Sequence, residues 1–335
     1  MRPYAIAVDL GGTNLRIAAV DERGQFLEKL TTETQVARGR DFVIDEMTQA
    51  IRRMMERFKA QGELRGIGIG VPGIIDMATG MLRESPNLPG WSQFPVQAEI
   101  ERRLGTPVVL ENDANAAALG EHWLGAAKEY PSMGMLTLGT GVGGGIVLDA
   151  KIWHGLNGMA GELGHINVIP EGHPCGCGSH GCLEQYASAT AIVRMAREAI
   201  AGGDAKELAR LAEREGEEFN SRKVFALAMQ GDEPARQVFE RMGRALGLVL
   251  AGLVNALNLP IYVLGGGAAN AWDAFAPAMM AEVRRRSFVY AATVPQAGPP
   301  PRAGIARDGV QAGLPARAGV ARDGVQVSPA ATGGK

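Results

Sequence analysis

The sequence predicts an α/β protein built from two related lobes. Runs with the apolar pattern of strands alternate with segments of helical periodicity along most of the chain, which favours this fold class. The chain has 335 residues, 46% of them hydrophobic, and this length suits about two domains with buried cores. A weak internal similarity links a hairpin at Asp9 with a hairpin at Leu138, since each reads as strand, glycine-rich turn, strand and acidic turn.

The N-terminal part reads as a hairpin, a third strand, and then helices and strands in alternation. Apolar runs at residues 4–8 and 15–20 flank a glycine-rich bend, and an acidic turn at 21–24 leads into the third strand. The elements predicted after it are a helix over 42–58, a strand at 66–71, a strand at 107–110 and an alanine-rich helix over 114–124.

The second part begins with a loop-rich segment and continues mainly as helices. Residues 134–184 contain 14 glycines, and strands are predicted within this segment at 135–138, 145–148 and 165–169. Residues 234–258 are apolar around nearly the whole helical circumference, which is typical of a helix buried on two sides. A core strand follows at 261–264.

The pattern divides the chain into a small lobe at residues 1–116, a large lobe at 117–297 and a flexible tail at 298–335. The tail repeats the decapeptide R-A-G-[I/V]-A-R-D-G-V-Q, and two copies are too few for a solenoid.

Composition excludes several classes of partner. Lys and Arg total 34 against 36 Asp and Glu, so a net charge of −2 offers no attraction for nucleic acid or an anionic membrane. The most apolar window, 245–264, contains Asn255, Asn258 and Pro260 and is unsuited to a membrane span. No secretory signal precedes the first strand, so we expect a cytoplasmic protein.

A glycine motif at residues 139–144 literally matches the dinucleotide fingerprint G-x-G-x-x-G, with Glu162 about 20 residues downstream as in that motif. The fingerprint must open a helix, whereas a strand is predicted here, so a zinc-containing NAD oxidoreductase is the weaker interpretation. A glycine turn between strands can instead offer backbone N–H groups to phosphate oxygens. Together with the bend at Asp9, it predicts two glycine hairpins that bind one polyphosphate.

Three cysteines predict a metal site. Cys175, Cys177 and Cys182 with His165 would supply a closed tetrahedral set for structural zinc, and glycines between the cysteines permit the tight loop. His173 and His180 compete with His165 as the fourth ligand, and three free thiols are the alternative interpretation.

Four polar residues are candidates for binding or catalysis. Asp113 lies between a strand and a helix, where it can either cap the helix or accept a proton from a hydroxyl. Glu162 and Glu184 lie in glycine-rich sequence where carboxylates commonly bind sugar hydroxyls, although either could be a surface acid. Asn87 could equally be a turn residue.

Four motifs together resemble the ROK family of sugar kinases and related repressors, and most closely its bacterial glucokinases. They are Asp9-Leu-Gly-Gly-Thr-Asn14, Glu111-Asn-Asp-Ala-Asn115, Gly161-Glu-Leu-Gly-His165 and Cys175-Gly-Cys-Gly-Ser-His-Gly-Cys-Leu-Glu184. The resemblance covers roughly residues 4–297. It implies a two-lobed, actin-like (ribonuclease-H-like) ATPase fold with nucleotide and sugar in the cleft between the lobes, a homodimer, and phosphorylation of the 6-hydroxyl of glucose by ATP.

The resemblance also implies a role for each matching residue. Asp113 is expected to be the general base that takes the proton of the sugar 6-hydroxyl. The other residues expected to bind the sugar are Gly73, Asn87, Asn112, Glu162, His165 and Glu184. Those expected to bind ATP are Gly11, Gly12, Thr13, Asn14, Thr140, Gly141, Gly265, Gly266 and Gly267, and Asp9 is expected to place Mg²⁺. His165 is expected to bind structural zinc with Cys175, Cys177 and Cys182.

Several alternatives remain open from sequence. N-acetylmannosamine, N-acetylglucosamine and fructose kinases of the family share the aspartate and most of the cysteine motif, and polyphosphate is an alternative donor. A repressor would carry a helix-turn-helix before the first hairpin, where only three residues stand. A non-catalytic actin-like nucleotide-binding protein would need neither the cysteines nor the Glu162 and Glu184 pair.

Overall fold

A computed structural model describes residues 2–85, 87–293 and 326–329, and the chain divides into two compact units. The first unit consists of Met1–Leu119 and Ile152–Gly161, and the second of Gly120–Lys151 and Glu162–Lys335. The segment 152–161 therefore packs with the first unit, which differs from its predicted place in the large lobe. Each unit is described by itself below.

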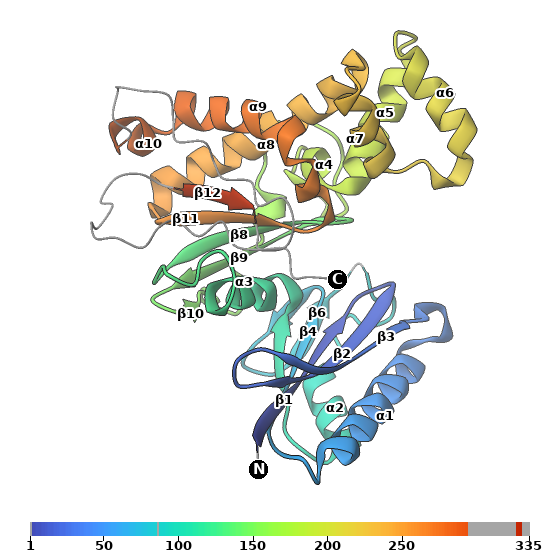
Figure 1. The fold of residues 1–335 in the computed structure, drawn as a ribbon, viewed down its shortest axis with the longest axis vertical. Helices are drawn as coiled ribbons and strands as arrows, with labels where there is room; N and C mark the ends of the chain where they lie inside the picture. The colour runs from blue at the N-terminus through green and yellow to red at the C-terminus, as the bar shows by residue number, and fades with distance from the viewer. Residues whose placement is uncertain (1, 86, 294–325, 330–335) are drawn as a thin grey trace. The chain divides into compact units, whose positions relative to one another are not determined.

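The first unit is built on a five-stranded sheet in the order β3-β2-β1-β4-β7 (Figure 1). The strands are β1 (Arg2–Leu10), β2 (Asn14–Asp21), β3 (Phe26–Glu33), β4 (Gly62–Val71) and β7 (Val109–Asn112). The first three are antiparallel, and β1, β4 and β7 run parallel. The other elements are η1 (Val36–Arg38), α1 (Arg40–Phe58), the hairpin of β5 (Ile74–Asp76) and β6 (Met81–Glu84), α2 (Val96–Leu104) and α3 (Asp113–Trp123), which continues into the second unit.

Helix α1 shows how the sequence pattern builds this core. Its apolar residues recur at helical spacing, and Ile44, Met47 and Ile51 are completely buried in the same core cluster as the sheet residues Ile6 and Ile69. Each such side chain contributes roughly 1.5–3 kcal/mol relative to its exposed state.

The second unit repeats the same arrangement of strands. Its sheet has the order β10-β9-β8-β11-β12, with an antiparallel β8–β9 hairpin and with β8, β11 and β12 parallel. These strands are β8 (Met133–Leu138), β9 (Val142–Leu148), β10 (Lys151–Ile152), β11 (Ile261–Gly265) and β12 (Gln326–Pro329). The matching order confirms the prediction of two lobes of similar construction.

Helices cover the second sheet, and the longest, α8 (Glu233–Leu257), lies at the centre of the core. The others are η2 (Leu163–His165), α4 (Glu184–Ala187), α5 (Ala189–Ala201), α6 (Lys206–Glu215), η3 (Gly216–Glu218), α7 (Ser221–Met229), η4 (Gly267–Ala271), α9 (Trp272–Arg286) and α10 (Phe288–Thr293). Helix α8 ends where Asn258 takes a left-handed conformation. Among the described helices, none has both the length and the apolar character needed to cross a membrane.

Two predicted features differ from the structure. The strand expected at 165–169 is absent, because the backbone there pairs with the cysteine loop: Val168 N–H donates to the Gly181 carbonyl and Leu183 N–H to the Ile166 carbonyl. Within the tail, residues 326–329 form β12 in parallel register with β11, where they cover a strand edge that would otherwise lack a partner. The rest of the predicted tail lies outside the described residues.

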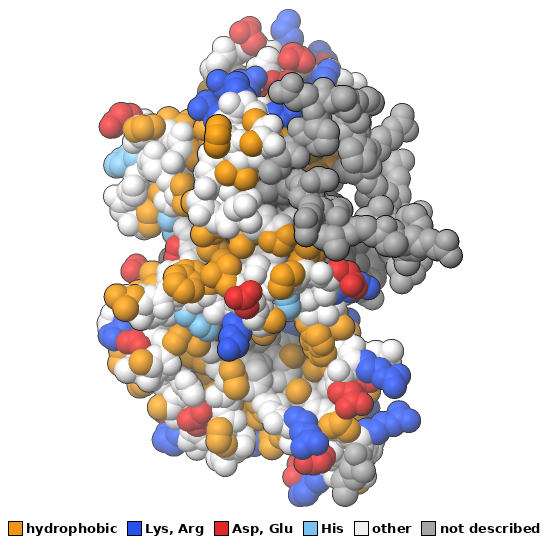
Figure 2. All heavy atoms as spheres, turned by 90° about the vertical axis from the view of Figure 1, so that its left-hand side faces the viewer, with side chains coloured by type: hydrophobic (Ala, Val, Ile, Leu, Met, Phe, Trp, Pro, Cys, Tyr) orange, Lys and Arg blue, Asp and Glu red, His pale blue; other side chains and the backbone are white. Residues whose placement is uncertain are grey.

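Figure 2 shows acidic and basic side chains mixed over the described part of the face it draws. This distribution agrees with the nearly balanced charge of the chain.

Helices α8 and α9 approach closely because α8 carries glycines at the crossing. A Cβ atom on Gly243 would collide with the Phe275 carbonyl oxygen, and one on Gly247 would lie 2.5 Å from the Met279 carbonyl oxygen. Gly252, in the same helix, faces open space.

We expect Gly243→Ala and Gly252→Ala to have opposite effects on stability. The first forces the two helix backbones apart and should lower the free energy of unfolding by about 1–3 kcal/mol. The second adds only helix propensity and should raise it by roughly 0.5–1 kcal/mol. Urea unfolding of both variants measures the difference, and equal stabilities would contradict this account of the crossing.

Candidate active site

The glycine bend of the first unit joins β1 to β2 and is held by its own backbone and by Thr34. Gly11 N–H donates to the Asn14 carbonyl at 2.9 Å, and the carbonyls of Gly11 and Thr13 accept from Thr34 Oγ1 and N–H at 2.6 and 2.9 Å. A Cβ atom on Gly12 would lie 2.8 Å from the Asn87 carbonyl oxygen. The bend therefore brings Asn87 beside the predicted phosphate-binding residues.

Asp9 and Asp113 lie at the same edge of the first sheet. Asp9 is opposite Gly70 of β4, and Gly70 is opposite Glu111 of β7, so the carboxyl ends of three parallel strands meet there. The Asp9 carboxylate is half-exposed and pairs with Arg16 at 2.7 Å.

The pKa of the Asp113 carboxyl is raised above its ordinary value. Its surface is accessible to solvent, but the protein around it displaces enough water to disfavour the charged form, and the negative charge of Asp9 acts in the same direction. The N–H of Ala114 opposes both effects by donating to Asp113 Oδ1 at 2.9 Å. A carboxylate in this setting is more basic than one in water.

Asn112 provides most of the cap of α3. Its Oδ1 accepts from the N–H groups of Ala114 and Asn115 at 2.8 and 3.1 Å, so it shares the Ala114 N–H with Asp113 and alone caps Asn115. Asn112 Nδ2 donates to the Gly73 carbonyl at 3.0 Å. Gly73 has φ of 117°, a conformation suited to glycine.

The glycine turn of the second unit joins β8 to β9 and resembles the first bend. Gly139 N–H donates to the Gly141 carbonyl at 2.9 Å, and the carbonyls of Gly139 and Thr140 accept from Ala189 N–H and Thr190 Oγ1 at the start of α5. Strand β9 follows the turn directly, so the helix that a dinucleotide fingerprint requires is absent from this position.

Three segments meet at Val142, the first residue of β9. Glu184 Oε2 accepts from the Val142 N–H at 3.0 Å, and the absence of a side chain at Gly141 leaves room for this carboxylate. Gly164 packs against the Val142 carbonyl so tightly that a Cβ atom there would collide with it. The short helix that contains His165 and directly follows Glu162 is thereby placed against the glycine turn.

His165, Cys175, Cys177 and Cys182 form one cluster, with ligand atoms within 4.8 Å of one another. The separations are 3.6 Å from Cys175 Sγ to His165 Nδ1 and 3.7 Å between the sulfurs of Cys177 and Cys182. A tetrahedral zinc with bonds of about 2.0–2.3 Å places its ligand atoms roughly 3.5–3.8 Å apart, so the residues fit this ion.

The surroundings of Cys182 and of the other two histidines complete the description of the cluster. Burial, together with hydrogen bonds to the neighbouring thiols of Cys177 and Cys175, raises the pKa of the Cys182 thiol to about 12. His173 Nδ1 instead lies 2.9 Å from the Pro174 carbonyl oxygen, and the cluster includes neither His173 nor His180.

The two glycines that follow β11, Gly266 and Gly267, have different surroundings. A Cβ atom on Gly266 would lie 2.5 Å from the Leu138 carbonyl oxygen, so this glycine permits close packing of two strand ends. Gly267 faces open space and begins η4. Of these two, Gly267 leaves more room for a ligand.

Comparison with known proteins places these features in a family. Residues 5–301 match the sequence model of the ROK family. The chain belongs to the ROK family. A glucokinase from Halalkalibacterium halodurans is 41% identical over 272 residues, which are 81% of this chain and 82% of that one. A glucokinase from Thermotoga maritima is 40% identical over 268 residues, with 80% and 83% covered.

A solved structure extends the likeness to the fold. A ROK family glucokinase from Streptomyces griseus, in complex with glucose and AMPPNP, has 31% sequence identity and a TM-score of 0.74, with 98% of this chain and 95% of that chain covered. This ROK protein therefore has the two-lobed actin-like ATPase fold that its motifs imply.

The structure also shows hydrogen bonds between residues of this ROK protein to which the sequence analysis gave no role. His154 Nε2 lies 2.7 Å from Glu111 Oε2, and Asn115 Nδ2 donates to Glu111 Oε1. Glu111 and Asn115 belong to a quoted motif but received no role there. His154 lies about 40 residues away in sequence, and no local pattern indicates that pair.

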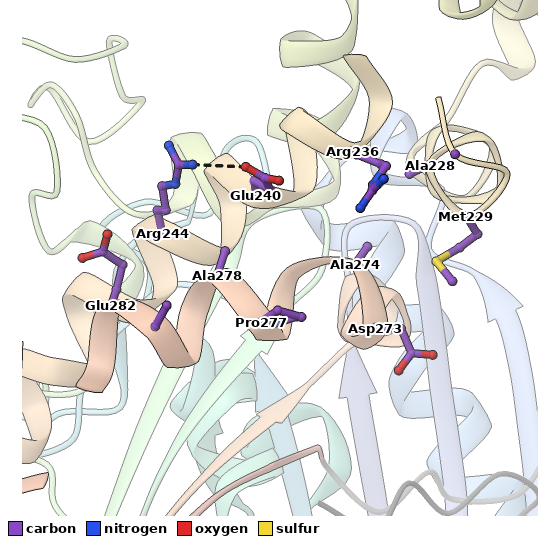
Figure 3. A pocket seen from close by; sticks show the side chains of 12 residues that line it. Ala228, Met229, Arg236, Glu240, Arg244, Asp273, Ala274, Pro277, Ala278 and Glu282 are labelled. Carbon is purple, nitrogen blue, oxygen red and sulfur yellow. Dashed lines mark hydrogen bonds and ion pairs between the residues drawn. The ribbon is translucent and has the colours of Figure 1, made fainter. Parts of the chain in front are cut away.

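A cavity of about 550 Å³ lies between α8, α9 and the end of α7, and none of the residues that line it is a predicted site residue of the ROK protein (Figure 3). Several of its charged side chains already have partners: Arg244 pairs with Glu240 at 3.1 Å, and Glu282 pairs with Arg285 and Arg286. We assign it no role.

Proposed function

We propose that this ROK protein transfers the γ-phosphoryl group of ATP to the 6-hydroxyl of glucose. The observation that carries the proposal is the basic carboxylate of Asp113 at the carboxyl edge of the first sheet, beside a glycine bend that suits phosphate. Glucokinases that are 40–41% identical over four-fifths of the chain support glucose as the substrate.

In the proposed reaction, Asp113 accepts the proton of the sugar 6-hydroxyl. The freed oxygen forms a bond to the γ-phosphorus while the bond from that phosphorus to the bridging oxygen breaks, which yields glucose 6-phosphate and ADP. Phosphoryl transfer depends mainly on positioning and charge neutralisation, and a positioned base adds typically ~10²–10⁴-fold.

Each unit supplies part of the proposed sugar contacts. Asn87, Asn112 and Gly73 accompany Asp113 in the first unit, where Asn112 is already bonded to Gly73. Glu162, His165 and Glu184 belong to the second, where Glu184 and the helix of His165 both contact Val142.

We propose that ATP contacts the two glycine turns. In the first unit these contacts involve Asp9, Gly11, Gly12, Thr13 and Asn14, and in the second Thr140, Gly141 and Gly265–Gly267. Mg²⁺, when bound, would neutralise charge on the phosphates. The half-exposed Asp9 carboxylate is an oxygen ligand of the type Mg²⁺ prefers, and its charge contributes to the raised pKa of Asp113.

We propose structural zinc on the cysteine cluster. Because His165 is proposed both as a zinc ligand and as a sugar contact, the ion would fix the sugar-binding wall without taking part in chemistry. The homodimer and the cytoplasmic location stay predictions.

A coupled assay that detects ADP, run with a panel of sugars, tests the proposal. We expect a higher kcat/KM for glucose than for N-acetylglucosamine, N-acetylmannosamine or fructose. We also expect a higher kcat/KM for ATP than for polyphosphate. A direct assay of glucose 6-phosphate compares the two phosphoryl donors. A higher kcat/KM for one of the other sugars would move the assignment to that hexose. Absence of turnover with every sugar would favour the non-catalytic nucleotide-binding alternative.

A further inference from the structure

A hydrogen-bonded pair of side chains, of which Glu111 lies two residues from Asp113, has no part in the mechanism above. Glu111 Oε2 lies 2.7 Å from His154 Nε2, and the two side chains are only 18% and 33% exposed. An ionised carboxylate can only accept hydrogen bonds, so the imidazole donates from Nε2. Both residues belong to the first unit.

The other oxygen of Glu111 holds two residues that flank Asp113. Glu111 Oε1 accepts from the Asn112 N–H at 2.9 Å and from Asn115 Nδ2 at 3.0 Å. Asn115 is 2% exposed, and its Oδ1 meets no donor among the described residues. A flipped amide would set that oxygen against the carboxylate, so Glu111 determines the orientation of Asn115.

Through these hydrogen bonds Glu111 influences the junction between strand β7 and helix α3, where Asp113 lies. Asn112 Oδ1 accepts from the N–H groups of Ala114 and Asn115, so the residues held by Glu111 also form the first turn of α3. Asp113 lies between them. The direction of its carboxylate therefore depends on a Glu111 side chain that is itself oriented by His154.

His154 is fixed independently by its own loop. The Ala160 N–H donates to the His154 carbonyl at 3.1 Å, which closes the loop. Gly158, with φ of 88°, lies so close to the hairpin of β5 and β6 that a Cβ atom would be 3.0 Å from the Ile75 carbonyl oxygen. The imidazole thus reaches Glu111 from a loop that is closed by its own hydrogen bond and packs on the hairpin of β5 and β6.

We propose that Glu111 and His154 are positioning residues for Asp113. His154 orients the Glu111 carboxylate. Glu111 in turn fixes the junction between β7 and α3, so that the Asp113 carboxylate points toward the hydroxyl that it deprotonates. The proposal rests on the proposed function, because it concerns the base of that reaction. A pair with a purely structural role would affect the free energy of unfolding and leave kcat unchanged.

The test compares His154→Ala with His154→Gln in the full chain, with kcat measured at saturating glucose and ATP. We expect His154→Ala to lower kcat by roughly 10- to 100-fold, the size of effect that a misplacement of about 1 Å can produce, with the KM for ATP nearly unchanged. Gln can donate from its amide nitrogen, so His154→Gln should regain most of the loss. The matched control is Arg57→Gln, which removes a 2.7 Å ion pair with Glu28 in the same unit and should keep wild-type kcat.

A double variant with Glu111→Gln tests whether the two residues act as a unit. We expect the double variant to turn over no more slowly than the slower single variant, whereas multiplied losses would overturn the proposal. Wild-type kcat in His154→Ala, with or without lower stability, would overturn it as well. If the proposed function itself were wrong, the wild-type protein would phosphorylate no sugar. That result is distinct from every outcome described for the variants.

Discussion

Replacement of Asp113 by Asn is expected to lower kcat for glucose phosphorylation by about 10²–10⁴-fold while glucose binding is retained. Asn keeps the shape of Asp and an oxygen that can accept from the Ala114 N–H, so the first turn of α3 should persist. It cannot accept the proton of the 6-hydroxyl. A coupled assay measures kcat, and titration calorimetry measures the Kd for glucose.

The pH dependence gives a second check on the same residue. Activity requires the ionised carboxylate, and the raised pKa means that this form is lost at a higher pH than for an ordinary aspartate. The acid limb of the wild-type kcat profile should therefore lie above the usual aspartate range. Asp21→Asn, which changes an acid in the turn after β2, is the control and should keep wild-type kcat. Undiminished kcat in Asp113→Asn would remove the assignment.

Local sequence pattern predicts much of the fold because the relevant interactions are local. The hairpin at Asp9 and the buried helix α8 follow from apolar periodicity and turn residues, and their observed bounds differ from the predicted ones by a few residues. The prediction of a strand at 165–169 is wrong because the backbone of this segment forms hydrogen bonds with Gly181 and Leu183. The apolar periodicity of a segment does not show which distant residues its backbone pairs with.

Residues that act through distant partners are harder to find from sequence. Cys175, Cys177 and Cys182 are close in the chain, so their spacing alone indicates a metal site, but only the structure selects His165 over His173 and His180. The contact between Glu111 and His154 depends on a segment that packs with the first unit after the chain has entered the second. No sequence motif indicates that this segment returns to the first unit.

Loss of Cys182, a proposed zinc ligand, is the second change with a large expected effect. Cys182 is completely buried, and structural zinc contributes about 10–16 kcal/mol of binding free energy in small zinc-binding peptides, so its loss should unfold the loop locally. We expect the wild-type protein to contain about one zinc per chain. Cys182→Ser should contain little zinc and show a lower free energy of unfolding.

The substitution should weaken the binding of glucose more than the binding of ATP, because the cluster contains His165 and the same loop leads into Glu184. We expect the KM for glucose in Cys182→Ser to rise by about tenfold or more, as for lost supports of a metal site, with a smaller change in the KM for ATP. His173→Ala is the matched control, since this histidine lies in the same loop outside the cluster and should keep the zinc. Metal analysis that finds no zinc in the wild-type protein, or equal zinc loss in both variants, would show that the cluster does not hold the ion.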